Sequence, residues 1–263
     1  MAALAAITAP FIAAPRRSVL LFDFDGTLAP IVADPTRARP VEGVVDRLRA
    51  VADRYLVVGV VSGRPVEFLA DRLPPDLDLS GSYGLESRVD GTMSDHPDAD
   101  RWRSVIAEAA RRMEASGPDG MRLEDKGLSI TVHYREHPDL GPAVTEAADE
   151  VAVATGLQAR LAKMSVELHP PIDADKGTAL RAMVAGAGRA VEPGEVVSAV
   201  LYAGDDLGDL PAFDALDETA GHGRSVARIA VGGDELPEEL AARADWVAAG
   251  PAALMALFDA LLA

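Results

Sequence analysis

The 263-residue chain contains no cysteine, so disulfide bonds and thiolate chemistry are excluded. A cysteine-free chain fits a reducing compartment, and we expect a cytoplasmic location. Basic residues are few, since 25 Lys and Arg stand against 42 Asp and Glu and give a formal net charge of −17. This charge opposes binding to nucleic acid or to an anionic membrane surface, and we expect neither as a partner. Phosphate chemistry in such a chain would need local positive charge.

Long apolar runs are also missing, because none approaches the ~20 residues that a membrane-spanning helix requires. The segment 1–15 is apolar and rich in alanine. A signal peptide carries its basic residues before the apolar stretch, whereas Arg16 and Arg17 follow it here. We therefore interpret this segment as a frayed leader. Hydrophobic residues make up 49% of the chain and charged residues 25%, as is typical of a globular protein.

Short apolar runs that alternate with helical patterns predict a doubly wound, Rossmann-like α/β domain with a parallel sheet. The predicted strands are 18–22, 55–61, 199–203, 227–231 and 245–248, and the predicted helices are 41–53, 65–73, 176–187, 209–216 and 251–262.

The middle third of the chain has a different pattern. Helical spacing at 98–115 and 141–154 alternates with two strands, 127–135 and 160–169, in which polar and apolar residues alternate strictly. Such half-polar strands are typical of an antiparallel sheet. We predict a core domain of residues 1–87 and 171–263 with a smaller α+β domain, 88–170, inserted into it. Periodicity alone favours a solvent-exposed polar face on this sheet, formed by Ser129, His133, Arg135, Lys163, Ser165, Glu167 and His169.

Two carboxylates, Asp23 and Asp25, follow the first predicted strand and precede a Gly-Thr turn. Side chains two residues apart on a strand point to the same side. Both would emerge at the carboxyl end of the strand, where open α/β sheets bind ligands. Paired carboxylates repel one another, so they need a proton, a metal ion or separate tasks. Taken alone, the pair is more typical of an aspartate-rich turn.

Three further polar clusters stand at the ends of predicted core elements. Ser62 and Arg64 follow the second predicted strand, and Lys176 opens a predicted helix, where its ammonium group could neutralise a phosphoryl oxygen. The acidic segment 204–209 offers hard oxygen ligands that suit Mg²⁺. Each cluster alone is typical of a turn, a surface lysine or an acidic helix cap. All four in this order indicate a functional site.

The four clusters resemble the motifs of the haloacid dehalogenase-like phosphohydrolases. This resemblance implies that Asp23 is the nucleophile that forms an aspartyl-phosphate and that Asp25 is the general acid and base. It also implies that Ser62 and Lys176 hold the phosphoryl group. The implied Mg²⁺ site consists of Asp23, Asp25, Asp205 and Asp209.

Within that superfamily, most of the chain is similar to the trehalose-6-phosphate phosphatases. The similar segments are 25–35, 81–86, 124–126, 133–135 and 166–170 with Lys176 and Gly177. The resemblance implies a small-molecule sugar phosphate as substrate, a cap formed by the inserted domain, and sugar contacts from Arg64, Lys126, His133 and Glu167.

Three features depart from the pattern of that family. Tyr83 stands where histidine is usual, His169 stands where arginine or lysine is common, and the fourth motif reads Asp-Asp-Leu-Gly-Asp instead of Asp-Asp-x-Thr-Asp-Glu. The resemblance implies hydrolysis of trehalose 6-phosphate to trehalose and phosphate. A phosphatase for sucrose 6-phosphate or mannosyl-3-phosphoglycerate is an alternative. A further alternative is a non-catalytic sugar-phosphate sensor. The presence of Asp23, Asp25 and Lys176 disfavours this alternative.

Overall fold

The computed structural model describes residues 2–32, 34–162, 164–232 and 236–263. The chain divides into two compact units, Met1–Ser94 with Ala174–Ala263, and Asp95–Asp173. The helices are α1 (Ala2–Ala13), α2 (Val44–Arg54), α3 (Val66–Ala70), α4 (Ala99–Ser116), α5 (Gly141–Thr155), α6 (Lys176–Ala190), α7 (Leu210–Gly221), α8 (Glu238–Arg243) and α9 (Met255–Leu262). The strands are β1 (Ser18–Phe22), β2 (Val57–Val61), β3 (Asp78–Gly81), β4 (Glu86–Val89), β5 (Thr92–Asp95), β6 (Arg122–Asp125), β7 (Ile130–His133), β8 (Gln158–Ala162), β9 (Ser165–His169), β10 (Ala199–Gly204), β11 (Ser225–Val231) and β12 (Trp246–Ala248).

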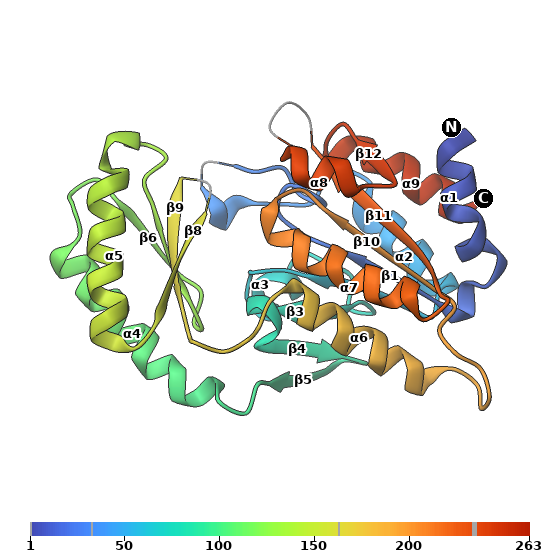
Figure 1. The fold of residues 1–263 in the computed structure, drawn as a ribbon, viewed down its shortest axis with the longest axis horizontal. Coiled ribbons are helices and arrows are strands. Elements are labelled where there is room, and N and C mark those ends of the chain that lie inside the picture. The colour runs from blue at the N-terminus through green and yellow to red at the C-terminus, as the bar shows by residue number, and fades with distance from the viewer. Residues whose placement is uncertain (1, 33, 163, 233–235) are drawn as a thin grey trace. The chain divides into compact units, whose positions relative to one another are not determined.

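The first unit is built on a sheet with the strand order β12-β11-β10-β1-β2-β3-β4-β5 (Figure 1). The strands from β12 to β3 pair in parallel, and β4 runs antiparallel to β3. All five apolar runs that we predicted as strands lie in the parallel part. The short strands β3, β4 and β5 have no alternating or apolar pattern long enough to have been predicted.

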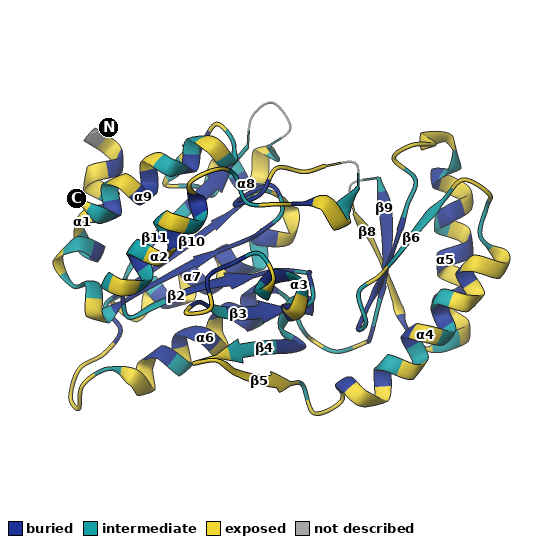
Figure 2. Ribbon diagram, turned by 180° about the vertical axis from the view of Figure 1, so that it is seen from behind, coloured by how far each residue is buried: buried dark blue, intermediate teal, exposed yellow. Residues whose placement is uncertain are grey.

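Helices cover both faces of this sheet, because successive side chains of a buried strand point to opposite faces. On β1, Leu20 and Phe22 join the core beneath α1, α2 and α9. Val19 and Leu21 join the other core, beneath α6 and α7. The central strands β10, β1, β2 and β3 are buried between these two layers, as their dark blue colour in Figure 2 shows, whereas the edge strand β5 is exposed. This arrangement is the doubly wound fold that the sequence predicts.

Our interpretation of the N-terminal segment as a frayed leader is wrong. Residues Ala2–Ala13 form α1, which packs against α9. Leu4 is 6% exposed and Phe11 is fully buried. This helix is apolar on nearly every side, so it has no amphipathic period by which to recognise it. It buries one side, with Leu4, Thr8 and Phe11, while its exposed positions are mostly alanine.

The second unit is an antiparallel sheet with the order β6-β7-β9-β8, together with α4 and α5, which pack on one another. The single strand predicted over 160–169 is wrong. The chain reverses there, so that β8 and β9 form a hairpin in which Ala162 pairs with Ser165. Met164 lies in this reversal with a φ of 57°. Methionine is not a usual turn residue, so no sequence signal marked the turn.

No helix in the described part of the chain is both long enough and apolar enough to cross a membrane.

Candidate active site

The polar clusters predicted at strand ends meet at one edge of the large sheet. Phe22, the last residue of β1, is in register with Ala203 of β10 and with Val60 of β2. Asp23 therefore lies between the ends of β10 and β2, and its N–H donates to the Ala203 carbonyl oxygen at 2.8 Å. Ser62 directly follows β2 and is 1% exposed.

The turn after Asp23 requires a glycine. Gly26 has a φ of +77°, and a Cβ at this position would collide with the Asp205 carboxylate. The segment that contains Asp23, Asp25 and Gly26 therefore lies directly against the acidic segment 204–209. Glycine satisfies both conditions, because it adopts positive φ without strain and lets another group approach its backbone closely.

Lys176 reaches the same edge from the first turn of α6. Asp175 caps this helix, since its carboxylate accepts from the Thr178 N–H at 2.7 Å. The Lys176 Nζ lies 3.1 Å from Asp23 Oδ2 and 2.7 Å from Asp209 Oδ1. Burial lowers the pKa of Lys176, but its attraction to Asp209 and Asp23 outweighs burial and holds that pKa well above its ordinary value. The lysine is therefore a cation fixed beside Asp23.

Asp209 is fully buried and accepts four hydrogen bonds. Its Oδ1 accepts from Lys176 Nζ and from the Tyr202 hydroxyl at 2.6 Å. Its Oδ2 accepts from the N–H groups of Asp205 and Asp206 at 2.9 and 3.1 Å. The sequence analysis missed Tyr202. A tyrosine in a buried apolar strand was a usable signal, because a buried phenol hydroxyl normally has a partner.

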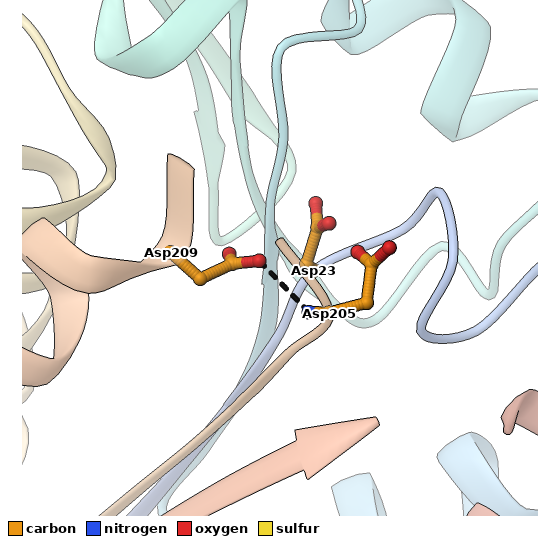
Figure 3. A group of neighbouring side chains, drawn as sticks. All are labelled: Asp23, Asp205 and Asp209. Atoms are coloured by element: carbon orange, nitrogen blue, oxygen red, sulfur yellow. Dashed lines mark hydrogen bonds between the residues drawn. The ribbon is translucent and has the colours of Figure 1, made fainter. Parts of the chain in front are cut away.

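Three carboxylates could hold a metal ion. Asp23, Asp205 and Asp209 each offer an oxygen, and these atoms lie within 4.8 Å of one another (Figure 3). Burial and the nearby carboxylates, with Asp23 foremost, raise the pKa of Asp205 to about 10. Burial also raises the pKa of Asp23, although Lys176 opposes this shift. A divalent cation would relieve the repulsion, and it prefers hard oxygen ligands of this kind. The donor set therefore fits a divalent metal ion.

The Asp25 side chain lies apart from that carboxylate cluster. It forms a bidentate ion pair with Arg64, whose Nε and Nη2 donate to the two carboxylate oxygens at 2.7 and 2.9 Å. The guanidinium group of Arg64 also lies over the Phe68 ring, 4.6 Å from its centroid. Arg64, which we predicted to contact the sugar, is thus bound to Asp25 in the structure. A planar bidentate pair of this kind fixes the orientation of the carboxylate.

An unusual backbone segment lies beside Ser62. Ser82 and Tyr83 have φ values of 49° and 58°, which is the left-handed region. This conformation costs residues other than glycine roughly 1–2 kcal/mol each. The Tyr83 N–H donates to the Ser62 carbonyl oxygen at 3.1 Å, and the Ser82 N–H donates to the Arg64 carbonyl oxygen at 2.9 Å. These two backbone hydrogen bonds therefore hold the segment against Ser62 and Arg64.

In the second unit, the predicted sugar contacts are engaged with one another. Glu167 accepts from the Ser129 hydroxyl at 2.8 Å and lies 3.4 Å from Lys126 Nζ. His133 Nε2 lies 2.8 Å from Glu124 Oε2, a partner that the sequence analysis did not identify.

The expectation of an exposed polar face on this sheet is wrong for Ser129, Ser165 and Glu167, which are all buried. Lys163 lies outside the described residues. Within the first unit the structure brings together Asp23, Lys176, Asp205 and Asp209, and within the second it brings together Lys126 and Glu167.

Comparison with known proteins identifies the family. The family model described as trehalose-phosphatase matches residues 21–240. This match covers most of both units and every predicted site residue. The chain belongs to the trehalose-phosphatase family. Membership and the buried acidic cluster together indicate a divalent metal site.

Curated members of the trehalose-phosphatase family show clear sequence similarity. Over 216 residues the chain is 33% identical to the trehalose-phosphate phosphatase of Mycobacterium leprae, a match that covers 78% of this chain and 49% of the relative. It is 35% identical to that of Mycobacterium avium over 214 residues, covering 77% of this chain and 52% of the relative. The chain spans about half the length of the curated relatives it matches.

Solved structures agree in fold with this family member. The C-terminal domain of Candida albicans trehalose-6-phosphate phosphatase matches with a TM-score of 0.78 and 24% identity, over 98% of this chain and 96% of that one. A haloacid dehalogenase-like hydrolase from Bacteroides thetaiotaomicron matches with a TM-score of 0.60 and 13% identity, over 92% and 98%. These likenesses confirm the predicted haloacid dehalogenase-like fold.

Proposed function

We propose that this protein is a Mg²⁺-dependent phosphatase that hydrolyses trehalose 6-phosphate to trehalose and phosphate. The observation that carries the proposal is the family match over residues 21–240. It is supported by the placement of Asp23 beside Lys176 and Asp205. We assign the cap to the unit 95–173, close to the 88–170 predicted from sequence. The cysteine-free composition supports a cytoplasmic location.

In the first half of the reaction, Asp23 acts as the nucleophile. Its carboxylate oxygen attacks the phosphorus atom, the ester bond to the sugar breaks, and an aspartyl-phosphate forms. Asp25 donates a proton to the departing sugar alkoxide, which leaves as trehalose. Ser62 and Lys176 hold the phosphoryl oxygens, and the lysine offsets the repulsion between the carboxylate and the phosphate dianion.

In the second half, water hydrolyses the aspartyl-phosphate. Asp25, now ionised, takes a proton from the water as its oxygen attacks phosphorus, and phosphate leaves while the Asp23 carboxylate is restored. The bidentate contact with Arg64 matches the ionised form of Asp25 that this half of the reaction needs, and it fixes the direction of the carboxylate. The proton count closes, since the proton that Asp25 gives to the sugar alkoxide is regained from the water.

The metal ion would be held by Asp23, Asp205 and Asp209. Asp25, which we also predicted as a ligand, lies outside this group of carboxylates and pairs with Arg64. When bound, the metal ion supplies positive charge that neutralises the carboxylates and the phosphoryl oxygens. We assign Mg²⁺ because carboxylate oxygens are its usual protein ligands at phosphate sites.

The sugar contacts are proposed for the cap. A disaccharide presents many hydroxyl groups and no charge beyond its phosphate, so carboxylate and hydroxyl partners suit it. Glu167, Lys126 and Ser129 form one hydrogen-bonded group, and His133 with Glu124 forms another. We propose that Lys126, His133 and Glu167 bind the sugar.

The proposal is tested by measuring phosphate release from trehalose 6-phosphate with Mg²⁺ and with a chelator. Sucrose 6-phosphate, mannosyl-3-phosphoglycerate and glucose 6-phosphate are assayed beside it. We expect magnesium-dependent release with strong preference for trehalose 6-phosphate. Asp23→Asn should lower turnover at least 10³-fold, because the nucleophile is lost. The matched control Asp53→Asn changes an exposed aspartate at the far end of α2 and should retain wild-type turnover.

Faster release from another ester would transfer the substrate assignment to that sugar phosphate and leave the mechanism intact. Wild-type turnover by Asp23→Asn would remove the nucleophile assignment. Absence of release from every ester would contradict the phosphatase proposal and favour a non-catalytic sensor.

A further inference from the structure

The strained turn between β3 and β4 points to a residue whose role the motifs do not explain. Ser82 and Tyr83 are consecutive residues with left-handed φ values, followed by Gly84 at +101°. Glycine and asparagine adopt this conformation routinely, whereas a tyrosine does so at a cost. Strained residues persist where the surrounding structure holds them, and they concentrate at functional sites.

The surroundings of this turn hold it firmly. Glu86 is 8% exposed, and its Oε2 accepts from the Val66 N–H at 2.9 Å and from the Ser82 hydroxyl at 3.3 Å. The backbone of the turn also bonds to Ser62 and Arg64. A buried carboxylate and two backbone hydrogen bonds therefore impose the left-handed conformation on Tyr83.

The effect of this conformation is to lay the Tyr83 ring against Gly63. A Cβ built on Gly63 would lie 2.6 Å from Tyr83 Cζ and 2.7 Å from its hydroxyl oxygen. The hydroxyl end of the ring thus covers the residue between Ser62, which we assign to phosphoryl binding, and Arg64, the partner of Asp25. Tyr83 is half-buried, so the residue is not fully enclosed by the fold.

We propose that Tyr83 is a specificity-determining residue that contacts the sugar next to its phosphate group. This inference rests on the proposed function. A phenol suits that position, because its ring packs against the C–H face of a pyranose while its hydroxyl group hydrogen-bonds to a sugar hydroxyl. Ser62 and Lys176 recognise only the phosphoryl group, which every phosphate ester shares. Tyr83 adds recognition of the leaving group from the same unit.

The test compares Tyr83→Phe and Tyr83→Asn with the wild type on trehalose 6-phosphate and on p-nitrophenyl phosphate, which has no sugar. Asparagine tolerates left-handed φ, so Tyr83→Asn removes the ring with the backbone conformation retained. We expect kcat/KM for trehalose 6-phosphate to fall about tenfold in Tyr83→Phe, the value of one neutral hydrogen bond. We expect a fall of about 100-fold in Tyr83→Asn, and changes of less than twofold on p-nitrophenyl phosphate.

The control is Tyr55→Phe, which removes a hydroxyl group at the opposite end of β2. Assayed well below its melting temperature, it should leave both kcat/KM values unchanged. Equal falls on the two substrates in Tyr83→Phe would overturn the proposal, because they would indicate a role in shaping the Ser62 turn. Unchanged kcat/KM values in both Tyr83 variants would overturn it as well.

Titration calorimetry distinguishes a failure of the Tyr83 contact from a failure of the proposed function. Trehalose 6-phosphate and inorganic phosphate are titrated into Asp23→Asn and into Asp23→Asn with Tyr83→Phe. Support requires that the second variant binds trehalose 6-phosphate about tenfold more weakly and phosphate equally well. Equal binding of trehalose 6-phosphate by the two variants would overturn the Tyr83 contact alone. Binding of phosphate but not of trehalose 6-phosphate by Asp23→Asn would overturn the substrate and the contact together.

Discussion

Replacing Asp205 with asparagine is expected to stabilise the metal-free protein and to remove most of its stabilisation by Mg²⁺. In the absence of metal, burial and the carboxylates of Asp23, Asp209 and Asp206 disfavour a charge on Asp205. Asparagine has nearly the same shape and carries no charge. The substitution therefore removes the cost of protonating this carboxyl group on folding, which the metal-free wild type must meet and a bound cation would make unnecessary.

The size of the effect follows from the pKa of Asp205, which is raised from 3.8 to about 10. Each pKa unit corresponds to about 1.4 kcal/mol, so the interval from 3.8 to neutral pH amounts to about 4 kcal/mol of lost stability. Because Asp205 is partly exposed, solvent screens the repulsion, and we take about half of that value. We therefore expect Asp205→Asn to raise the melting temperature of the metal-free protein by about 5 °C.

The pH dependence has a definite sign. Since the pKa is raised on folding, the folded protein binds this proton more tightly than the unfolded chain does. Stability from the protonated group is complete below pH 3.8 and is lost as pH rises toward about 10. The difference in stability between Asp205→Asn and the wild type should therefore widen from pH 6 to pH 9.

The assay is thermal unfolding followed by circular dichroism, in chelator and in excess Mg²⁺, with Asp53→Asn as the control. Saturating metal at 100 times its dissociation constant stabilises the wild type by about 2.7 kcal/mol. The Asp205→Asn variant should gain much less, and the control should behave as the wild type. A metal-free Asp205→Asn protein that melts below the wild type, or one that responds fully to Mg²⁺, would refute the reasoning.

Three further predictions concern other parts of the first unit. Phe11→Ala should cost about 3–5 kcal/mol in urea unfolding, because Phe11 of α1 is fully buried in the core, whereas a frayed segment would show no change. Tyr55→Phe should cost about 1–3 kcal/mol in the same assay, since its hydroxyl donates to the buried Leu261 carbonyl oxygen at 2.7 Å. Arg64→Lys breaks the bidentate pair with Asp25 and should lower kcat/KM for trehalose 6-phosphate about 10²-fold. It should lower kcat/KM for p-nitrophenyl phosphate less than tenfold, because formation of the aspartyl-phosphate from that ester needs no proton for the leaving group, and equal losses in kcat/KM would contradict the general-acid role given to Asp25.

The parallel sheet and the sheet-edge part of the site could be predicted from sequence because both depend on local patterns. Strands buried on two faces are continuous apolar runs, and polar residues directly after such runs must lie at one sheet edge. This reasoning placed Asp23, Ser62 and Asp205 together before the structure was known. The position of Lys176 at the start of a helix could also be predicted from a local pattern, since Asp175 is a recognisable helix cap.

The contacts that the sequence analysis missed join residues far apart in the chain. No spacing rule connects Asp25 to Arg64, or Tyr83 to Gly63, because tertiary packing brings these pairs together. The reversal at Met164 depends on a left-handed residue of a type that rarely adopts that conformation. We did not predict α1 because a helix with apolar residues on nearly all sides has no alternation of polar and apolar faces in its sequence.

The strand order of the large sheet has a consequence for biosynthesis. β2 follows β1 closely in the chain, but the other neighbour of β1, strand β10, spans residues 199–204. The whole unit 95–173 leaves the ribosome in between. One edge of the buried strand β1 therefore stays open until β10 has been made, and open apolar edges are prone to aggregate. A nascent chain stalled before residue 199 would expose that edge.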